Sequence, residues 1–108
     1  MTDRPFAIYL NANARRVSPE VVSRIEELVH PDDIFFAEDP EDAFRFAAFI
    51  LERDYPTVFT GGGDGTVVGL INALRQVAGG DAEAIPALGV LSLGTGNALS
   101  RMVSSTGA

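Results

Sequence analysis

The sequence predicts an α/β fold in which helices cover both faces of a parallel sheet, a three-layer, Rossmann-like arrangement. Apolar, β-favouring runs alternate with segments whose apolar residues recur at helical spacing, in the order β-α-β-α-β-α-β-α. Such alternation is typical of parallel strands joined by right-handed helical crossovers. Two glycine-rich turns also follow directly on predicted strands. The 108 residues have room for one domain of this kind.

The first strand and helix are predicted near the start of the chain. The apolar run Phe6–Leu10 predicts the strand, and a polar loop follows at 11–16. Ser18 and Pro19 are a good capping residue and first-turn proline, so a helix begins there and ends before Pro31. Its predicted buried stripe consists of Val21, Val22, Ile25, Leu28 and Val29.

The second strand is predicted at Ile34–Ala37 and the second helix at Ala43–Arg53. The acidic segment Glu38–Asp42 between them is typical of a helix start, and we assign no site to it. We expect the single histidine, His30, to be a solvent-exposed cap at the end of the preceding helix. The predicted apolar face of the second helix consists of Phe44, Phe46, Ala47, Ala48, Ile50 and Leu51.

The third strand is predicted at Tyr55–Thr60, and the helix after it is expected to begin near Val67 and end at Gly79. A fourth strand, Leu88–Leu93, is apolar enough to be buried on both faces, and a further helix is expected at Ala98–Val103. The predicted buried stripe of the third helix consists of Val67, Leu70, Ile71, Leu74 and Val77.

Composition and charge exclude several classes of function. The net charge of −7 gives no electrostatic help in binding nucleic acid. All eight basic residues are arginines, so a Walker A loop and Schiff-base chemistry are excluded. The chain has no cysteine for disulfides or thiolate zinc sites. Because no apolar run approaches the roughly 18 residues that span a bilayer and no secretory signal is present, we expect a cytoplasmic protein.

The segment Thr60–Thr66 is the strongest functional signal in the chain. It contains four glycines between a predicted strand and a predicted helix. A run of glycine is costly on folding unless the turn needs positive φ or a ligand must approach the backbone closely. The start of a helix also directs N–H groups at one point, which suits phosphate. A dinucleotide-binding fingerprint is excluded, because its third glycine would fall on Val68.

Ligands of parallel α/β sheets bind at the carboxyl ends of the strands. The loop 11–16, the turn Gly61–Thr66 and the second glycine turn Gly94–Asn97 all follow predicted strands. We therefore expect these three segments to share one edge of the sheet.

Two motifs in this order resemble the diacylglycerol kinase catalytic domain. The segment Gly62–Thr66, followed by an apolar helix with Asn72, resembles the Gly-Gly-Asp-Gly-Thr motif of that family. The segment Leu93–Asn97, together with Arg101, resembles the family's Leu-Gly-Thr-Gly-Asn motif and its later arginine. Asn11 resembles the asparagine of the family's first loop. The resemblance spans nearly the whole chain. NAD kinases are more distant relatives of that family and share its Gly-Gly-Asp-Gly-Thr motif.

This resemblance implies an ATP-dependent lipid kinase that uses Mg²⁺. Asp64 is implied as the catalytic acid–base residue, which accepts the proton of the lipid hydroxyl or holds Mg²⁺ through water. The glycine backbone would hold the phosphates. The implied nucleotide-binding residues are Asn11, Gly62, Gly63, Gly65, Thr66, Gly94, Thr95, Gly96 and Asn97.

Family members continue into a larger, mostly β, C-terminal domain. We therefore expect residues 1–108 to be the nucleotide-binding domain, with the lipid bound through the second domain and the protein peripheral at the membrane. The isolated chain is expected to bind nucleotide weakly without turnover. The face that packs on the second domain could instead support a homodimer.

Two alternatives remain open. One is an NAD kinase-like enzyme that phosphorylates a soluble substrate. The other is a non-catalytic nucleotide-binding module, which is suggested by departures from the family pattern. These departures are Ala12, Ser92 and Ala98, and the chain also differs from the family pattern at Arg15 and Ala37.

Overall fold

The computed structural model describes residues 6–15 and 17–91, in which four parallel strands form one sheet. The strands are β1 (Ala7–Asn11), β2 (Ile34–Ala37), β3 (Thr57–Gly61) and β4 (Ala87–Val90), in the spatial order β2-β1-β3-β4. The helices are α1 (Pro19–Leu28), α2 (Asp42–Glu52) and α3 (Asp64–Val77), with short 3₁₀ turns at Pro31–Asp33 and Ala82–Ala84. The predicted parallel α/β fold is confirmed.

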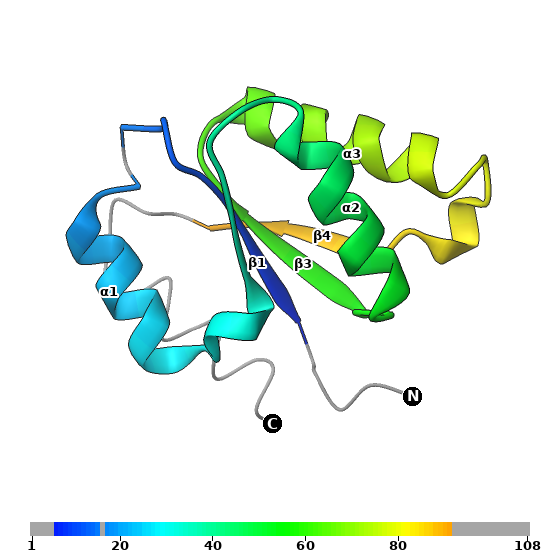
Figure 1. Cartoon of the computed structure of the whole chain (residues 1–108). Coiled ribbons are helices and arrows are strands. Elements are labelled where there is room, and N and C mark those ends of the chain that lie inside the picture. Colours follow the sequence, from blue (N-terminus) through cyan, green and yellow to red (C-terminus); the bar gives the residue numbers. More distant parts are fainter. Residues whose placement is uncertain (1–5, 16, 92–108) are drawn as a thin grey trace.

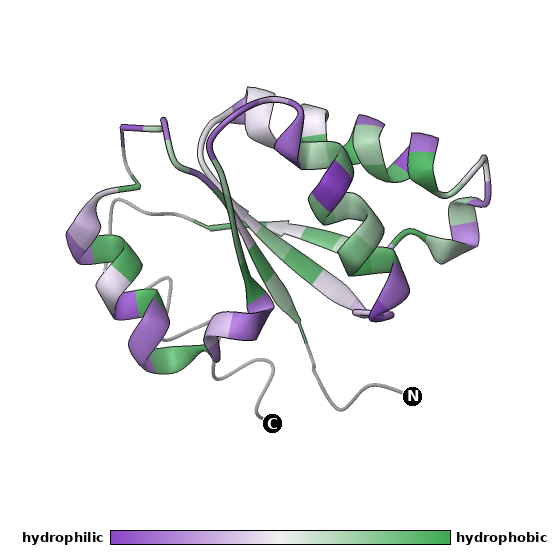
Figure 2. Ribbon diagram, viewed as in Figure 1, coloured by the Kyte–Doolittle hydropathy of each residue, from purple (hydrophilic) through white to green (hydrophobic). Residues whose placement is uncertain are grey.

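The sheet lies between two helical layers, with α1 on one face and α2 and α3 on the other (Figure 1). The central strand β1 is therefore buried on both sides. Ala7 and Tyr9 pack in the cluster with α2 and α3, whereas Ile8 and Leu10 pack with α1. Apolar colouring accordingly runs along the strands, while the helices carry polar residues on their outer sides (Figure 2). Within the described ranges, no helix has the length and apolar character needed to cross a bilayer.

The helix α1 begins as its sequence predicts. The hydroxyl of Ser18 accepts a hydrogen bond from the Val21 N–H at 3.2 Å, and proline occupies the first turn. Ile25 and Val29, one turn apart, pack against the sheet. Leu28 was expected in this stripe, but its exposed fraction is 48%. The cluster on this face of the sheet takes Val21, Val22, Ile25 and Val29 from this part of the chain, and Leu28 lies outside it.

The helix α2 buries a narrower face than predicted. Ala43, Ala47 and Ile50 recur at helical spacing and are buried against the sheet. Phe44 and Ala48 were expected on the apolar face, but both are exposed. They lie one position beyond the buried row, which rotates them by about 100° away from the sheet.

The third helix starts earlier than predicted, and the fourth strand is more exposed than predicted. The helix α3 begins at Asp64 rather than near Val67, so the end of the glycine segment is helical. Val77 at its end is 41% exposed, which corrects the predicted stripe. Val90 is 67% exposed, so the described part of the fourth strand is not buried on both faces. The reason is that β4 lies at the edge of the described sheet.

The amino ends of the strands carry a polar cluster. The hydroxyl of Tyr55 donates to a carboxylate oxygen of the buried Asp33 at 2.5 Å, and Arg53 donates to the Asp32 carbonyl at 2.6 Å. His30 is exposed as expected, but its ring accepts from the Asp32 N–H and caps the following 3₁₀ turn instead of ending α1. This cluster ties β2 to β3 on the side opposite the strand exits.

Candidate functional site

A pocket of about 1070 Å³ opens at the carboxyl ends of β1 and β3. These strands are neighbours, yet the helices that follow them, α1 and α3, cover opposite faces of the sheet (Figure 1). Chain connections diverge at such a position and leave a crevice between them, which is where open α/β sheets bind ligands. The pocket is lined by the loops after β1 and β2, the start of α2, the glycine turn and one face of α3.

Asn11, the last residue of β1, connects two of these segments. Its side-chain amide nitrogen lies 3.3 Å from the Thr66 hydroxyl in the first turn of α3. Its side-chain oxygen accepts a hydrogen bond from the Asn13 N–H at 2.9 Å, which shapes the loop after β1. The expected meeting of the first loop with the glycine turn is therefore found.

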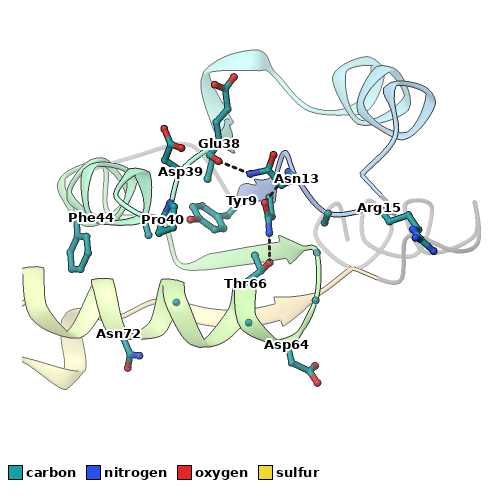
Figure 3. Close-up of a pocket in the computed structure, with 18 of the residues that line it drawn as sticks. Tyr9, Asn13, Arg15, Glu38, Asp39, Pro40, Phe44, Asp64, Thr66 and Asn72 are labelled. Atoms are coloured by element: carbon teal, nitrogen blue, oxygen red, sulfur yellow. Dashed lines mark hydrogen bonds between the residues drawn. The ribbon is translucent and has the colours of Figure 1, made fainter.

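The loop after β2 is joined to the same edge. The Asn13 side-chain amide donates to the Glu38 carbonyl at 2.6 Å, and the Ala12 N–H donates to the Ala37 carbonyl at 2.7 Å. Asn13 therefore fixes the spacing between the first two strand exits (Figure 3). The sequence indicated a polar loop here, but nothing in it identified the partner on the second loop.

The glycine turn needs its glycine at one position above all. Gly62 has a φ of +151°, a backbone conformation that side chains rarely adopt. A Cβ atom added there would lie 3.1 Å from the Thr66 Cβ and 3.2 Å from the Asn11 Cβ, and it would overlap the Thr66 hydroxyl. Only glycine lets the three segments approach this closely.

The start of α3 leaves hydrogen-bond donors free at the pocket. Gly63 is the N-cap, and within the described residues no side chain caps this helix. The Thr66 N–H donates to the Gly63 carbonyl, but no described group accepts from the N–H groups of Asp64 and Gly65. Together with the positive end of the dipole of this 14-residue helix, these donors suit an anion such as phosphate.

Three further glycines leave the backbone bare although packing does not require it. A Cβ atom at Gly63, Gly65 or Gly69 would meet no protein atom within 4 Å. Gly65 and Gly69 are one turn apart in α3 and both line the pocket. Glycine inside a helix costs stability, so these positions favour close approach of a ligand over helix strength.

Asp64, the predicted catalytic residue, is exposed at the first position of α3. Its carboxylate points away from Thr66 and Tyr9 (Figure 3). Arg15 also lines the pocket, and its guanidinium points away from Tyr9 (Figure 3). It is the one basic side chain among the described lining residues, so the positive potential of the described lining comes mainly from backbone N–H groups.

Asp42 shapes the loop after β2. One of its carboxylate oxygens accepts hydrogen bonds from the N–H groups of Asp39 and Glu38 at 3.0 and 2.9 Å, and the other contacts Arg45 at 3.2 Å. The Asp39 and Glu38 N–H groups, and then Arg45, hold the pKa of Asp42 below its usual range. The acidic run is thus a helix start, as expected, but Glu38 and Asp39 also line the pocket.

The sequence did not indicate the aromatic part of the pocket. Tyr9 was assigned only to a strand and Phe44 only to the core, yet both line the pocket together with Pro40 (Figure 3). Asn72 and Gln76 extend this part along α3. Phe44 is 45% exposed, whereas Ala47 and Ile50, which were predicted on the same helix face, are buried.

The second glycine turn lies outside the described residues, with Ser92, Ala98 and Arg101. The predicted site residues affected are Gly94, Thr95, Gly96 and Asn97. The predicted site residues that the structure describes, by contrast, all line the one pocket. These are Asn11, Gly62, Gly63, Asp64, Gly65 and Thr66.

Metal binding by the protein alone finds little support in the described ranges. There, no three acidic or histidine side chains come together as a cation cage. Mg²⁺ commonly takes one or two carboxylates and completes its coordination with water and substrate phosphates. Asp64 beside the free N–H groups fits that shared mode of binding.

Comparison with known proteins gives a consistent result. The sequence profile of the diacylglycerol kinase catalytic domain matches residues 8–107. A probable lipid kinase YegS-like from Chromohalobacter salexigens is 37% identical over 78 residues, which cover 72% of this chain and 24% of that protein.

Two other relatives match at different levels. Probable lipid kinase YegS from Escherichia coli is 48% identical over 56 residues, covering 52% of this chain and 18% of that protein. Diacylglycerol kinase 3 from Arabidopsis thaliana is 28% identical over 113 residues, covering 90% of this chain and 23% of that protein. The chain thus spans about a quarter or less of the length of these curated relatives.

Proposed function

The chain belongs to the diacylglycerol kinase catalytic domain family, and from this membership we propose that it is the nucleotide-binding part of an ATP-dependent lipid kinase. In this proposal the pocket holds the triphosphate of ATP, and the γ-phosphoryl group moves to a lipid hydroxyl. The relatives are described as lipid kinases and a diacylglycerol kinase, which supports the class of reaction but leaves the lipid of this protein unspecified.

The observation that carries the proposal is that Asn11, Gly62 and Thr66 come together at the carboxyl ends of β1 and β3. The helices that follow these two strands lie on opposite faces of the sheet. Phosphoryl transfer mainly requires positioning and stabilisation of charge. Free backbone N–H groups at a helix start provide both without lysine, which this chain lacks.

Each residue has a role in this proposal. The N–H groups around Gly63 and Gly65 and the hydroxyl of Thr66 bind phosphate oxygens, while Asn11 orients that hydroxyl. Asp64 accepts the proton that the lipid hydroxyl loses as its oxygen bonds to the γ-phosphorus, while the bond from the γ-phosphorus to the bridging β-phosphate oxygen breaks and ADP leaves. When bound beside Asp64, Mg²⁺ would neutralise charge on the phosphates.

Carboxylates near the pocket make a cation important. Glu38, Asp39 and Asp64 line it, and Arg15 is the one basic residue among the described lining residues. A triphosphate brought among these carboxylates is repelled unless a cation accompanies it. We therefore propose that nucleotide binding depends on Mg²⁺.

We further propose that residues 1–108 act together with a second domain that binds the lipid at the membrane surface. The short share of the relatives that the chain covers supports this division. Gly94, Thr95, Gly96 and Asn97 complete the nucleotide site in this proposal.

The direct test is a titration of the 108-residue chain with ATP, with and without Mg²⁺, followed by NMR. Shifts at residues 62–66 that need Mg²⁺ are expected. The complete protein, including the proposed second domain, is then offered diacylglycerol and NAD as phosphate acceptors. Phosphorylation of NAD alone, or indifference to ATP, would contradict a lipid kinase.

A further inference from the structure

Tyr9 has a hydroxyl group that the fold does not use. The residue is 4% exposed, and its ring packs edge-on against Phe46 with 6.3 Å between the ring centres. In the described part of the chain no group forms a hydrogen bond with the Tyr9 hydroxyl, yet every fully buried side-chain polar atom there has a partner. The hydroxyl must therefore be the part of Tyr9 that reaches the pocket, which Tyr9 lines (Figure 3).

The other tyrosine, Tyr55, provides the contrast. It is 3% exposed, and its hydroxyl donates to Asp33 and lies 3.4 Å from an Arg53 nitrogen. A buried tyrosine in this fold therefore has protein partners where no pocket is present. At position 9 phenylalanine would fill the same core volume without a polar group, so packing does not explain the Tyr9 hydroxyl.

The surroundings of Tyr9 indicate which part of a ligand it meets. Its ring lies between the polar side with Thr66 and the start of α2 with Pro40 (Figure 3). Beyond Pro40 the pocket is lined by the exposed ring of Phe44, and Asn72 lies along α3. N–H groups at the start of α3 suit phosphates, whereas a phenol, an exposed aromatic face and a carboxamide suit a sugar and a planar base.

Burial, and then the carboxylate of Asp42, raise the pKa of the Tyr9 hydroxyl above its usual range. The group therefore stays neutral near pH 7 and keeps its proton to donate.

Building on the proposed nucleotide-binding function, we propose that Tyr9 is a positioning residue whose hydroxyl hydrogen-bonds the nucleoside part of the bound nucleotide, in a subsite walled by Phe44. It does not contact the phosphate chain, which the glycine turn holds. A nucleotide runs from phosphates through sugar to base, in the same order as the glycine turn, Tyr9 and Phe44 along the pocket.

The test compares Tyr9→Phe with the matched control Tyr55→Phe in the 108-residue chain. Both variants are titrated with ATP and with inorganic tripolyphosphate in Mg²⁺, and thermal unfolding is recorded without ligand. Tyr9→Phe should raise the Kd for ATP by about 3- to 10-fold, leave the Kd for tripolyphosphate unchanged and leave the unfolding midpoint unchanged or higher. Tyr55→Phe should lower the midpoint and leave the Kd for ATP unchanged.

Three outcomes would overturn the inference. An unchanged Kd for ATP in Tyr9→Phe overturns it while the proposed function stands. Equal weakening of ATP and tripolyphosphate also overturns it, because that result indicates a general distortion of the site. A wild-type chain without affinity for ATP overturns the proposed function and this inference together. If tripolyphosphate binds the wild type too weakly to titrate, the ATP comparison with the Tyr55 control decides.

Discussion

The side-chain amide of Asn11 lies 3.3 Å from the hydroxyl of Thr66, although 55 residues separate them in the chain. The contact joins the end of β1 to the first turn of α3, which follows the neighbouring strand β3. The helices after these two strands, α1 and α3, cover opposite faces of the sheet. Because Thr66 is 9% exposed, the pair is held partly away from water, where a lost hydrogen bond is costly. The pair therefore both supports the fold and fixes the pocket.

Thr66→Val should weaken both properties. Valine keeps the shape of the side chain but removes the acceptor of the Asn11 amide, so we expect a loss of about 1 kcal/mol in the free energy of unfolding. Affinity for ATP should fall as well, because the proposed phosphate contact is lost. Chemical denaturation measures the free energy of unfolding, and an ATP titration measures the affinity. In an Asn11→Ala background, Thr66→Val should cost much less unfolding free energy than it does in the wild type. Additive losses in the double variant would show that the pair is not coupled.

Gly62→Ala should damage the fold itself. The new methyl group would overlap the Thr66 hydroxyl and crowd the Asn11 Cβ at 3.2 Å, at a φ of +151°. We expect a loss of roughly 2–3 kcal/mol, measured as a lower midpoint of thermal or denaturant unfolding.

Gly63→Ala is the matched control for Gly62→Ala. The φ of Gly63 is −103°, which alanine adopts freely, and a Cβ atom added there would meet nothing within 4 Å. Stability should stay within about 0.5 kcal/mol of wild type, whereas affinity for ATP should fall if phosphate approaches the backbone there. Equal destabilisation by the two variants would contradict the geometry of the turn.

Much of the fold could be predicted because its signals are local. Ser18 and Pro19 placed the start of α1, and the strand Ile34–Ala37 was predicted with its observed bounds. The errors arose where tertiary contact decides which apolar residues are covered. Phe44 has the spacing of a core residue, but the pocket rather than the sheet lies beside it.

The site could be predicted in part for the same reason. Glycines after a strand identify a turn, and the parallel topology brings Asn11 to it. Tyr9 could not be identified, because whether a tyrosine on a buried strand directs its hydroxyl at a partner or a pocket depends on the packing around it. The Asn13 bond to the Glu38 carbonyl was also hidden, since a backbone acceptor leaves no trace in sequence.

Asp42→Asn should change how stability depends on pH. The lowered pKa of Asp42 means that the folded state favours its carboxylate, so its contribution is complete at neutral pH and is lost as the pH falls through the lowered folded-state pKa. The variant should have a lower unfolding midpoint at pH 7 and a flatter midpoint between about pH 5 and 3. Asp39→Asn is the control, because no described group donates to that carboxylate. Parallel curves for wild type and Asp42→Asn would contradict this role.

Asp64→Asn should separate binding from catalysis. The residue is exposed at the start of α3, so the fold and the affinity for ATP should be retained. In the complete protein the rate of lipid phosphorylation should fall by about 10²- to 10⁴-fold, as expected when a positioned general base is removed. Asp81→Asn removes the same charge beyond the other end of α3 and should leave the rate unchanged. Biological activity that survives Asp64→Asn would favour a non-catalytic nucleotide-binding module.

Gly69→Ala should stabilise the protein and weaken nucleotide binding. Gly69 lies inside α3, where alanine is favoured over glycine by roughly 0.5–1 kcal/mol, and its added Cβ would meet no atom within 4 Å beyond the adjoining backbone of the helix. The unfolding midpoint should therefore rise by roughly 2 to 8 °C. The same methyl group would project into the pocket that Gly69 lines, so affinity for ATP should fall. A variant that gains stability with full ATP affinity would show that the nucleotide does not pass over this part of α3, and would restrict the binding surface to the glycine turn.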